Sequence, residues 1–270
     1  MAETNQTHQV FRPENLSELF SIWRRIPGAV PYAGGTFLSR EQPEMPLDTL
    51  SLEKIDELHS ITRTERYLEI GAMVRLGEII ALGKIVPNAF SLTIHSIASP
   101  PVRNLATIGG NICIGGDTTA PLSALDALYE LRNSEESRWI SALRFSSDRK
   151  LQNSELLTRI RIPLEEWNYT IYRKFNSPDS GSEGGVLILL VQNQKNTLTK
   201  IQVVFTGAAL LRNKDSEAML EGKALPLDRR DLVNFKKHWQ EYLQNLEKPG
   251  PFLRDKILNS IETGIEELSD

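Results

Sequence analysis

The sequence predicts an α+β protein of two domains, and three patterns support that prediction. Short extended and helical segments alternate over residues 1–163, which predicts one domain there. Two apolar strands, 185–192 and 198–209, are joined by NQKNT and predict an antiparallel hairpin. Amphipathic helices follow. The second domain, 168–270, is therefore expected to be a small antiparallel sheet covered by helices.

The first domain is expected to begin with strands and then a helix. Residues 29–32 predict a strand that runs into a turn at Gly34–Gly35, and alternating apolar residues over 68–72 predict a half-buried strand. Asn88 is expected to cap a helix with one apolar face. The Pro100–Pro101 pair is expected to end that helix, because proline cannot continue the hydrogen-bond ladder.

The rest of the first domain is expected to alternate in the same way. Residues 122–131 are apolar and either helical or extended. Residues 139–145 predict a short strand and a helix, and 155–162 predict a strand that ends at Pro163. The domain boundary is placed at 163–167, where this pattern stops.

The second domain is expected to begin with strands and end with helices. YTIYRKF predicts a strand, and VLILLV at 186–191 predicts a buried strand, with the turn formers NSPDSGSEGG between them. Apolar residues recur at helical spacing from Leu232 to Leu246, after an acidic start at Asp228. A second amphipathic helix is predicted from Leu253 to Leu268.

Composition argues against several classes of function. The net charge is −4 over 270 residues, and no cluster of Lys and Arg forms a stripe for nucleic acid. The N-terminus does not resemble a signal peptide and no apolar run could cross a membrane, so a cytoplasmic protein is expected. The single cysteine, Cys113, allows neither an internal disulfide nor an iron–sulfur cluster, and the four histidines lack zinc-ligand spacing. We expect no metal site.

No residue is predicted to be catalytic, because no nucleophile–base pair can be proposed. Cys113 is expected to be a small buried residue that packs a loop, since no second cysteine or base is adjacent. The scattered tryptophans at 23, 139, 167 and 239 are expected in the core.

Two glycine clusters are the candidate binding elements, PYAGGTFL at 31–38 and TIGGNICIGG at 107–116. A Gly-Gly turn lets the backbone approach an anion and lets successive N–H groups converge on phosphate oxygens. Taken alone, either cluster is also compatible with a plain tight turn. Neither has the GxGxxG or P-loop spacing, so a dinucleotide held by a Rossmann unit is not supported.

The order of three strings resembles a known family. AGGTFL, LEIGAMVRLGEI at 68–79 and PPVRNLATIGGNIC at 100–113 resemble the FAD-binding domain of molybdenum hydroxylase flavoprotein subunits, of the xanthine dehydrogenase and carbon monoxide dehydrogenase type. ELLTRIRIP, YRKF and the 203–225 stretch resemble the second domain of the same subunits. The resemblance implies a two-part FAD-binding domain of the PCMH type at 1–163 and a carbon monoxide dehydrogenase flavoprotein-like domain at 168–270.

The same resemblance implies a set of residues around FAD. N–H groups of the first cluster would wrap the pyrophosphate, the second cluster would contact the other side of the phosphates and the ribityl chain, and the remaining residues would lie near the adenine or the flavin. The residues implied at the pyrophosphate are Ala33, Gly34, Gly35, Thr36, Phe37 and Leu38. Those implied at the other side of the phosphates and the ribityl chain are Thr107, Gly109, Gly110 and Asn111, and those near the adenine or the flavin are Leu157 and Lys174.

The chain departs from the family pattern at three places. An Asp usual after IGGN is replaced by Thr119 or Ala120, which leaves Asp117 as the nearby carboxylate and as the candidate cofactor-binding residue in this segment. Phe37 follows AGGT, where Asp is common, and NSPDSGSEGG replaces an Arg-Arg and Asp pattern. These changes affect the expected contacts at the flavin edge and, through them, the expected electron acceptor.

By this resemblance the chain is expected to be an FAD-carrying electron-transfer subunit. Electrons would leave a molybdenum-cofactor subunit, pass through 2Fe–2S clusters on a partner subunit, reach this FAD and reduce NAD or another acceptor. Two alternatives stay open. One is a self-sufficient flavoenzyme related to UDP-N-acetylenolpyruvoylglucosamine reductase, and the other is a scaffold subunit that has lost FAD.

Overall fold

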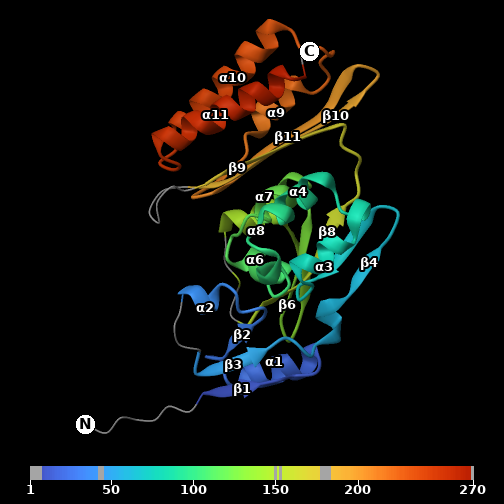
Figure 1. Cartoon of the computed structure of the whole chain (residues 1–270), viewed down its shortest axis with the longest axis vertical. Coiled ribbons are helices and arrows are strands. Elements are labelled where there is room, and N and C mark those ends of the chain that lie inside the picture. The colour runs from blue at the N-terminus through green and yellow to red at the C-terminus, as the bar shows by residue number, and fades with distance from the viewer. Residues whose placement is uncertain (1–7, 42–45, 149–150, 152–153, 177–183, 269–270) are drawn as a thin grey trace, which may run out of the picture.

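The computed structural model describes residues 8–41, 46–148, 151, 154–176 and 184–268. The chain forms three sheets that follow one another along an elongated molecule, with the N-terminal sheet at one end and the C-terminal helices at the other (Figure 1). The first two sheets belong to the predicted FAD-binding domain, which therefore has two parts as expected. The third belongs to the predicted C-terminal domain.

The first part is a parallel sheet in the order β1-β3-β2 with a helix packed on it. Helix α1 begins after Asn15, whose side chain accepts a hydrogen bond from the Glu18 N–H, and it buries Leu19 and Trp23 in a small core. The elements of this part are β1 Gln9–Phe11, α1 Leu16–Arg25, β2 Val30–Tyr32, α2 Leu38–Glu41 and β3 Asp48–Ser51, followed by the 3-10 turn η1 Asp56–His59.

The second part is an antiparallel sheet in the order β4-β5-β8-β6-β7, with helices on one face. Strand β8, which ends this part of the chain, lies between β5 and β6 and so closes the unit on itself. Its elements are β4 Ile61–Arg63, β5 Tyr67–Gly71, α3 Leu76–Ala81, η2 Gly83–Ile85, α4 Asn88–Ser96, α5 Pro100–Arg103, α6 Ile108–Cys113, α7 Thr119–Ala124, β6 Leu128–Arg132, β7 Ser137–Ser141, α8 Ala142–Asp148 and β8 Leu156–Pro163.

The third sheet has the order β12-β11-β10-β9 and is antiparallel throughout. Its predicted hairpin is confirmed, and Lys195 and Asn196 both have positive φ, as a two-residue turn between twisted strands requires. The elements are β9 Tyr169–Phe175, β10 Gly185–Gln194, β11 Thr197–Gly207, β12 Leu210–Leu211, α9 Lys214–Leu220, α10 Arg229–Gln244 and α11 Pro251–Glu266.

The third sheet is covered on both faces. Helices α9, α10 and α11 pack on one face, where Leu187 and Leu189 join the core around Trp239. On the other face, Val186 and Ile188 join the core of the second part, against α4 and α7. Burial on both sides explains why VLILLV is a continuous apolar run and not an alternating one. A short connection, residues 164–168, leads from β8 to β9.

Several local predictions need correction. Helix α4 already ends at Ser96, and Pro100 and Pro101 begin α5, because the missing N–H of proline costs nothing in a first helical turn. Pro87 precedes the first helical residue of α4, and Asn88 makes no capping bond. Residues 122–131, predicted as one apolar stretch, divide into the end of α7 and β6.

The tryptophans were only partly predicted. Trp23 and Trp239 are buried, but Trp139 and Trp167 are half-buried beneath cations. Arg161 lies 4.2 Å from the Trp139 ring centroid, and Lys200 lies 5.1 Å from that of Trp167. These two rings therefore support charged side chains at the surface.

Candidate functional site

The first glycine cluster forms a loop, residues 33–38, between β2 and α2. Within the described part of the chain, nothing accepts a hydrogen bond from the backbone N–H groups of this loop, whereas the carbonyls of Gly35 and Phe37 do accept bonds from α2. Gly35 has φ +67°, a conformation that favours glycine. A group of unpaired, neighbouring N–H donors is what a bound anion requires.

The second glycine cluster lies beside the first. A Cβ on Gly34 would be 1.9 Å from the Leu105 carbonyl oxygen, so the loop is in direct contact with the backbone that leads into ATIGGN. The Thr107 side chain caps α6 by accepting a hydrogen bond from the Gly110 N–H at 3.1 Å. The Gly109 N–H donates to the Ala72 carbonyl at 2.9 Å. The bond between Thr107 and Gly110 thus fixes the start of α6, and the bond from Gly109 holds this helix against the 71–76 segment.

Arg103, in the VRN string, has a structural role. One terminal nitrogen of Arg103, Nη1, donates to the Ile97 and Ala98 carbonyls, each at 2.8 Å, at the end of α4. Ala98 has φ +45°, so Arg103 stabilises a strained connection. Arg103 therefore fixes the connection between α4 and α5, which precedes the second glycine cluster in the chain.

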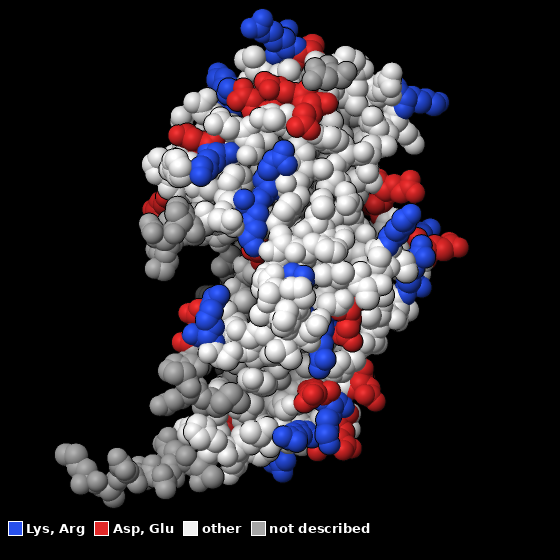
Figure 2. Space-filling view, in the orientation of Figure 1, with Lys and Arg blue, Asp and Glu red and all other residues white. Residues whose placement is uncertain are grey.

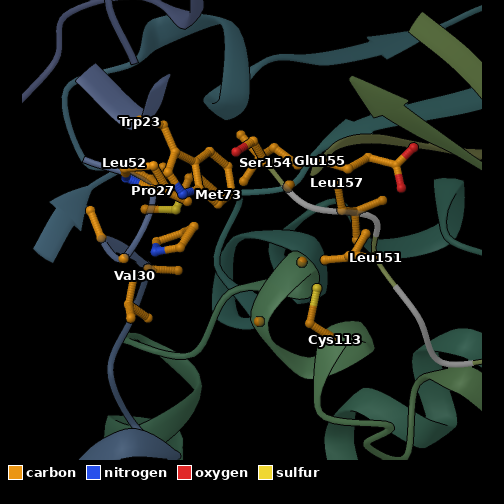
Figure 3. A pocket seen from close by; sticks show the side chains of 18 residues that line it. Trp23, Pro27, Val30, Leu52, Met73, Cys113, Leu151, Ser154, Glu155 and Leu157 are labelled. Carbon is orange, nitrogen blue, oxygen red and sulfur yellow. The ribbon is translucent and has the colours of Figure 1, made fainter. Parts of the chain in front are cut away.

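A cavity of about 590 Å³, here called the first cavity, opens between the first two parts of the domain (Figure 3). Of the predicted residues, Ala33, Gly109, Gly110 and Leu157 line it. Sequence reasoning missed the apolar wall, because its members come from distant segments and carry no motif. That wall includes Trp23, Pro27, Val30, Leu52, Met73, Cys113, Leu151 and Leu156.

Cys113 is exposed in this cavity, which corrects the prediction of a buried loop residue. Its side chain points into the hollow from the last turn of α6 (Figure 3). Protein nonetheless surrounds much of the sulfur, and this desolvation raises the pKa of the Cys113 thiol to about 11. The thiol is therefore protonated and weakly nucleophilic at neutral pH.

A second cavity of about 440 Å³ lies between the 114–117 segment, which follows α6, and the ends of β9, β10 and β11. Asp117 and Lys174 both line it, and the Lys174 Nζ is 2.8 Å from the Asp117 carboxylate. Asn111 does not line either cavity; its side-chain oxygen accepts hydrogen bonds from the Thr118 N–H and hydroxyl, and so fixes the Gly116–Thr118 loop. The structure thus places Leu157 and Lys174 at different cavities.

Thr119, one of the two residues expected to replace the family's carboxylate, is buried between the two domains. Its hydroxyl donates to the Gly116 carbonyl at 2.7 Å and lies 3.2 Å from the Thr206 hydroxyl on β11. A neutral hydroxyl pair therefore fills this position, and Asp117 is the carboxylate that faces the cavity.

Comparisons with known proteins identify the family of the N-terminal 165 residues. Residues 5–165 match the family model described as the FAD binding domain in molybdopterin dehydrogenase. The chain belongs to this family. FAD is the cofactor that membership implies, and the expected two-part FAD-binding domain is confirmed.

Two relatives illustrate the match along the chain. The glyceraldehyde dehydrogenase medium chain of Sulfolobus acidocaldarius is 26% identical over 211 residues, which cover 73% of this chain and 74% of that one. The nicotinate dehydrogenase FAD-subunit of Eubacterium barkeri is 25% identical over 242 residues, which cover 82% and 81%.

Two solved structures show the same fold across nearly the whole chain. Carbon monoxide dehydrogenase from Hydrogenophaga pseudoflava superposes with a TM-score of 0.78 at 21% identity, covering 97% of this chain and 96% of that one. Quinoline 2-oxidoreductase from Pseudomonas putida gives 0.78 at 19% identity, covering 97% and 95%. The C-terminal α+β part is therefore also confirmed as a fold.

The residues present fit FAD. The loop of unpaired N–H groups suits a pyrophosphate, and the first cavity falls within the roughly 300–1,000 Å³ typical of cofactor sites, with the mostly apolar walls such sites have. Among the described residues, no group of three or more His, Cys, Asp or Glu is arranged to hold a metal ion.

Two further observations concern other ligand classes. On the face shown in Figure 2, basic and acidic side chains are interspersed and no continuous basic stripe crosses the molecule. None of the described helices is both long and apolar enough to span a membrane.

Proposed function

We propose that this chain is the FAD-carrying electron-transfer subunit of a multi-subunit molybdenum hydroxylase. The observation that supports it most is the loop of unpaired N–H donors, 33–38, at the junction of the two glycine clusters, in a chain of the molybdopterin dehydrogenase FAD-binding family. Bound FAD supplies the redox chemistry. The chain itself binds the cofactor, orients it and keeps water from its apolar parts.

The two cavities suggest how the cofactor is oriented. The pyrophosphate is proposed to lie on the 33–38 loop, so the two arms of FAD extend to either side of α6. The first cavity is apolar, and its carboxylate, Glu155, is already bound by Arg138 at 2.8 Å, which suits the uncharged adenosine arm. The second cavity holds Lys174, which suits the flavin ring, because the polar edge of the ring becomes more negative on reduction.

The partners of the chain are proposed on the same basis. Relatives are named as medium chains or FAD-subunits of dehydrogenases. These names support a 2Fe–2S subunit and a molybdenum-cofactor subunit as separate polypeptides, since the 270 residues here include a single cysteine and cannot themselves supply the thiolates of an iron–sulfur cluster. NAD or another acceptor would then receive the electrons. A cytoplasmic location stays a prediction.

The proposal is tested by adding FAD to the purified chain. We expect stoichiometric uptake with a flavin absorbance band, and no turnover of NADPH by the chain alone. NADPH-dependent turnover without partners would favour the self-sufficient reductase. Association with a molybdenum subunit in the absence of any bound flavin would favour the scaffold.

Cys113 provides a direct probe of the first cavity, because no other thiol competes. With a pKa of about 11, the thiolate population rises about tenfold per pH unit up to that value, so alkylation by iodoacetamide should be slow at pH 7 and accelerate steadily to pH 10. Saturating FAD should slow the reaction at every pH by covering the thiol. Alkylation is followed by mass spectrometry.

The urea-unfolded chain is the control for this reaction. Its thiol should titrate near the ordinary value of about 8.5 and should react equally fast with and without FAD. Alkylation of the folded chain at an unchanged rate in saturating FAD would show that the cofactor does not enter the first cavity.

A further inference from the structure

The ion pair between Asp117 and Lys174 joins two domains at the wall of the second cavity. Asp117 precedes α7 in the second part of the FAD-binding domain, and Lys174 belongs to β9 of the C-terminal sheet. Their atoms are 2.8 Å apart, and the two side chains are only 29% and 31% exposed. The pair is thus fixed and partly shielded from solvent.

Lys174 is held by a second contact as well. Its Nζ donates to the Ser96 carbonyl at 3.2 Å, at the C-terminal end of α4, where helix carbonyls carry a partial negative charge. Tyr172, two residues earlier on β9, donates to the Ser96 hydroxyl at 2.5 Å. Because Arg103 occupies the next carbonyls, at 97 and 98, the Ser96 carbonyl is left for Lys174.

This pair carries the charge of the described lining of the second cavity. The other described lining residues are glycines, apolar residues, Asn176 and Thr206, so Asp117 and Lys174 are the charged groups among them. As a pair, Asp117 and Lys174 present no net charge. Without Asp117, the described lining would present a single cation.

We propose that Asp117 is a positioning residue for the flavin. Its carboxylate fixes Lys174 at the second cavity and cancels its charge, so that the bound ring meets a neutral pair in place of a free cation. This inference rests on the proposed function and on the placing of the flavin ring in the second cavity. It assigns to Asp117 the negative charge that neutralises Lys174, which the buried, neutral hydroxyl of Thr119 cannot provide.

The consequence is a measurable shift in the reduction potential of bound FAD. Reduction adds negative charge to the ring, which a cation stabilises and an anion opposes. Asp117→Asn should therefore favour reduced over oxidised FAD by about tenfold, a rise of about 30 mV for a two-electron couple. Lys174→Met should lower the potential by a similar amount, and the double variant should return it close to that of the unaltered chain.

The experiment is an equilibrium redox titration of the full chain loaded with FAD, against a reference dye. Asp117→Glu should retain the original potential. Asp126→Asn is the control, because Asp126 also joins the two domains, through Arg212 at 3.0 Å, but lies outside the second cavity. We expect the reduction potential of FAD bound to Asp126→Asn to equal that of the unaltered chain. A merely structural role of Asp117 would alter stability or FAD affinity without this order of potentials.

The outcomes separate this inference from the proposed function. Failure of the unaltered chain to bind FAD contradicts the proposed function, and the inference with it. Normal FAD binding with equal potentials in the unaltered chain and Asp117→Asn overturns the inference alone. Should Asp117→Asn fail to fold, Lys174→Met decides the matter, because an unchanged potential there shows that the pair does not act on the flavin.

Discussion

Replacement of Gly34 by alanine is expected to weaken FAD binding strongly. A Cβ at this position would lie 1.9 Å from the Leu105 carbonyl oxygen and 2.8 Å from the carbonyl carbon, and both belong to backbone that cannot rotate aside. The 33–38 loop must therefore move away from the segment that carries the second glycine cluster. We expect FAD affinity to fall by ~100-fold or more, which is about 3 kcal/mol, in a fluorescence titration of the purified chain.

Gly28→Ala is the matched control for this change. Gly28 lines the first cavity, to which the 33–38 loop contributes Ala33, but a Cβ on Gly28 would meet nothing within 4 Å. Its FAD affinity should fall far less than that of Gly34→Ala, because the added methyl group displaces no backbone, although it lies at the wall of the cavity proposed for the adenosine arm. Circular dichroism should show folded protein for both variants. Equal FAD affinity of the two variants would mean that the loop does not hold the cofactor.

The elements that could be predicted from the sequence are those fixed by local patterns. The hairpin of β10 and β11 follows from two apolar runs around a short turn, and α10 follows from helical spacing after Asp228, whose side chain does accept a hydrogen bond from the Asp231 N–H. The glycine clusters could be recognised in the same way. Their approach to one another through Leu105 was implied by the resemblance but not by spacing.

The features that could not be predicted depend on contacts between distant segments. Cys113 is exposed because the first two parts of the domain leave a cavity in front of α6, which no local pattern encodes. The pairing of Asp117 with Lys174 requires the two domains to dock in one arrangement. The prediction that Pro100 and Pro101 end a helix was wrong, because proline can also stand in the first turn of a helix, as it does in α5.

Replacement of Ile188 by alanine is expected to destabilise the protein by about 2–5 kcal/mol. Ile188 is fully buried on the face of β10 that packs against α7, within a core that also contains Leu122 and Ile94. Removing three methyl or methylene carbons there leaves a cavity that neither domain can fill, because strands and helices fix its walls. Urea unfolding followed by tryptophan fluorescence measures the loss.

Ile61→Ala is the corresponding control, because it makes the same chemical change at a residue that is 38% exposed on the edge strand β4. Ile61→Ala should lower the free energy of unfolding by no more than about 1 kcal/mol.

Ile188 also pairs in register with Tyr172, which binds the end of α4. Loss of the Ile188 side chain should therefore weaken the docking that positions Lys174. Ile188→Ala should therefore bind FAD more weakly at urea concentrations where Ile61→Ala still binds normally. Equal stability of the two variants would mean that the C-terminal sheet does not share its core with the FAD-binding domain, and the second cavity would then lack a fixed wall.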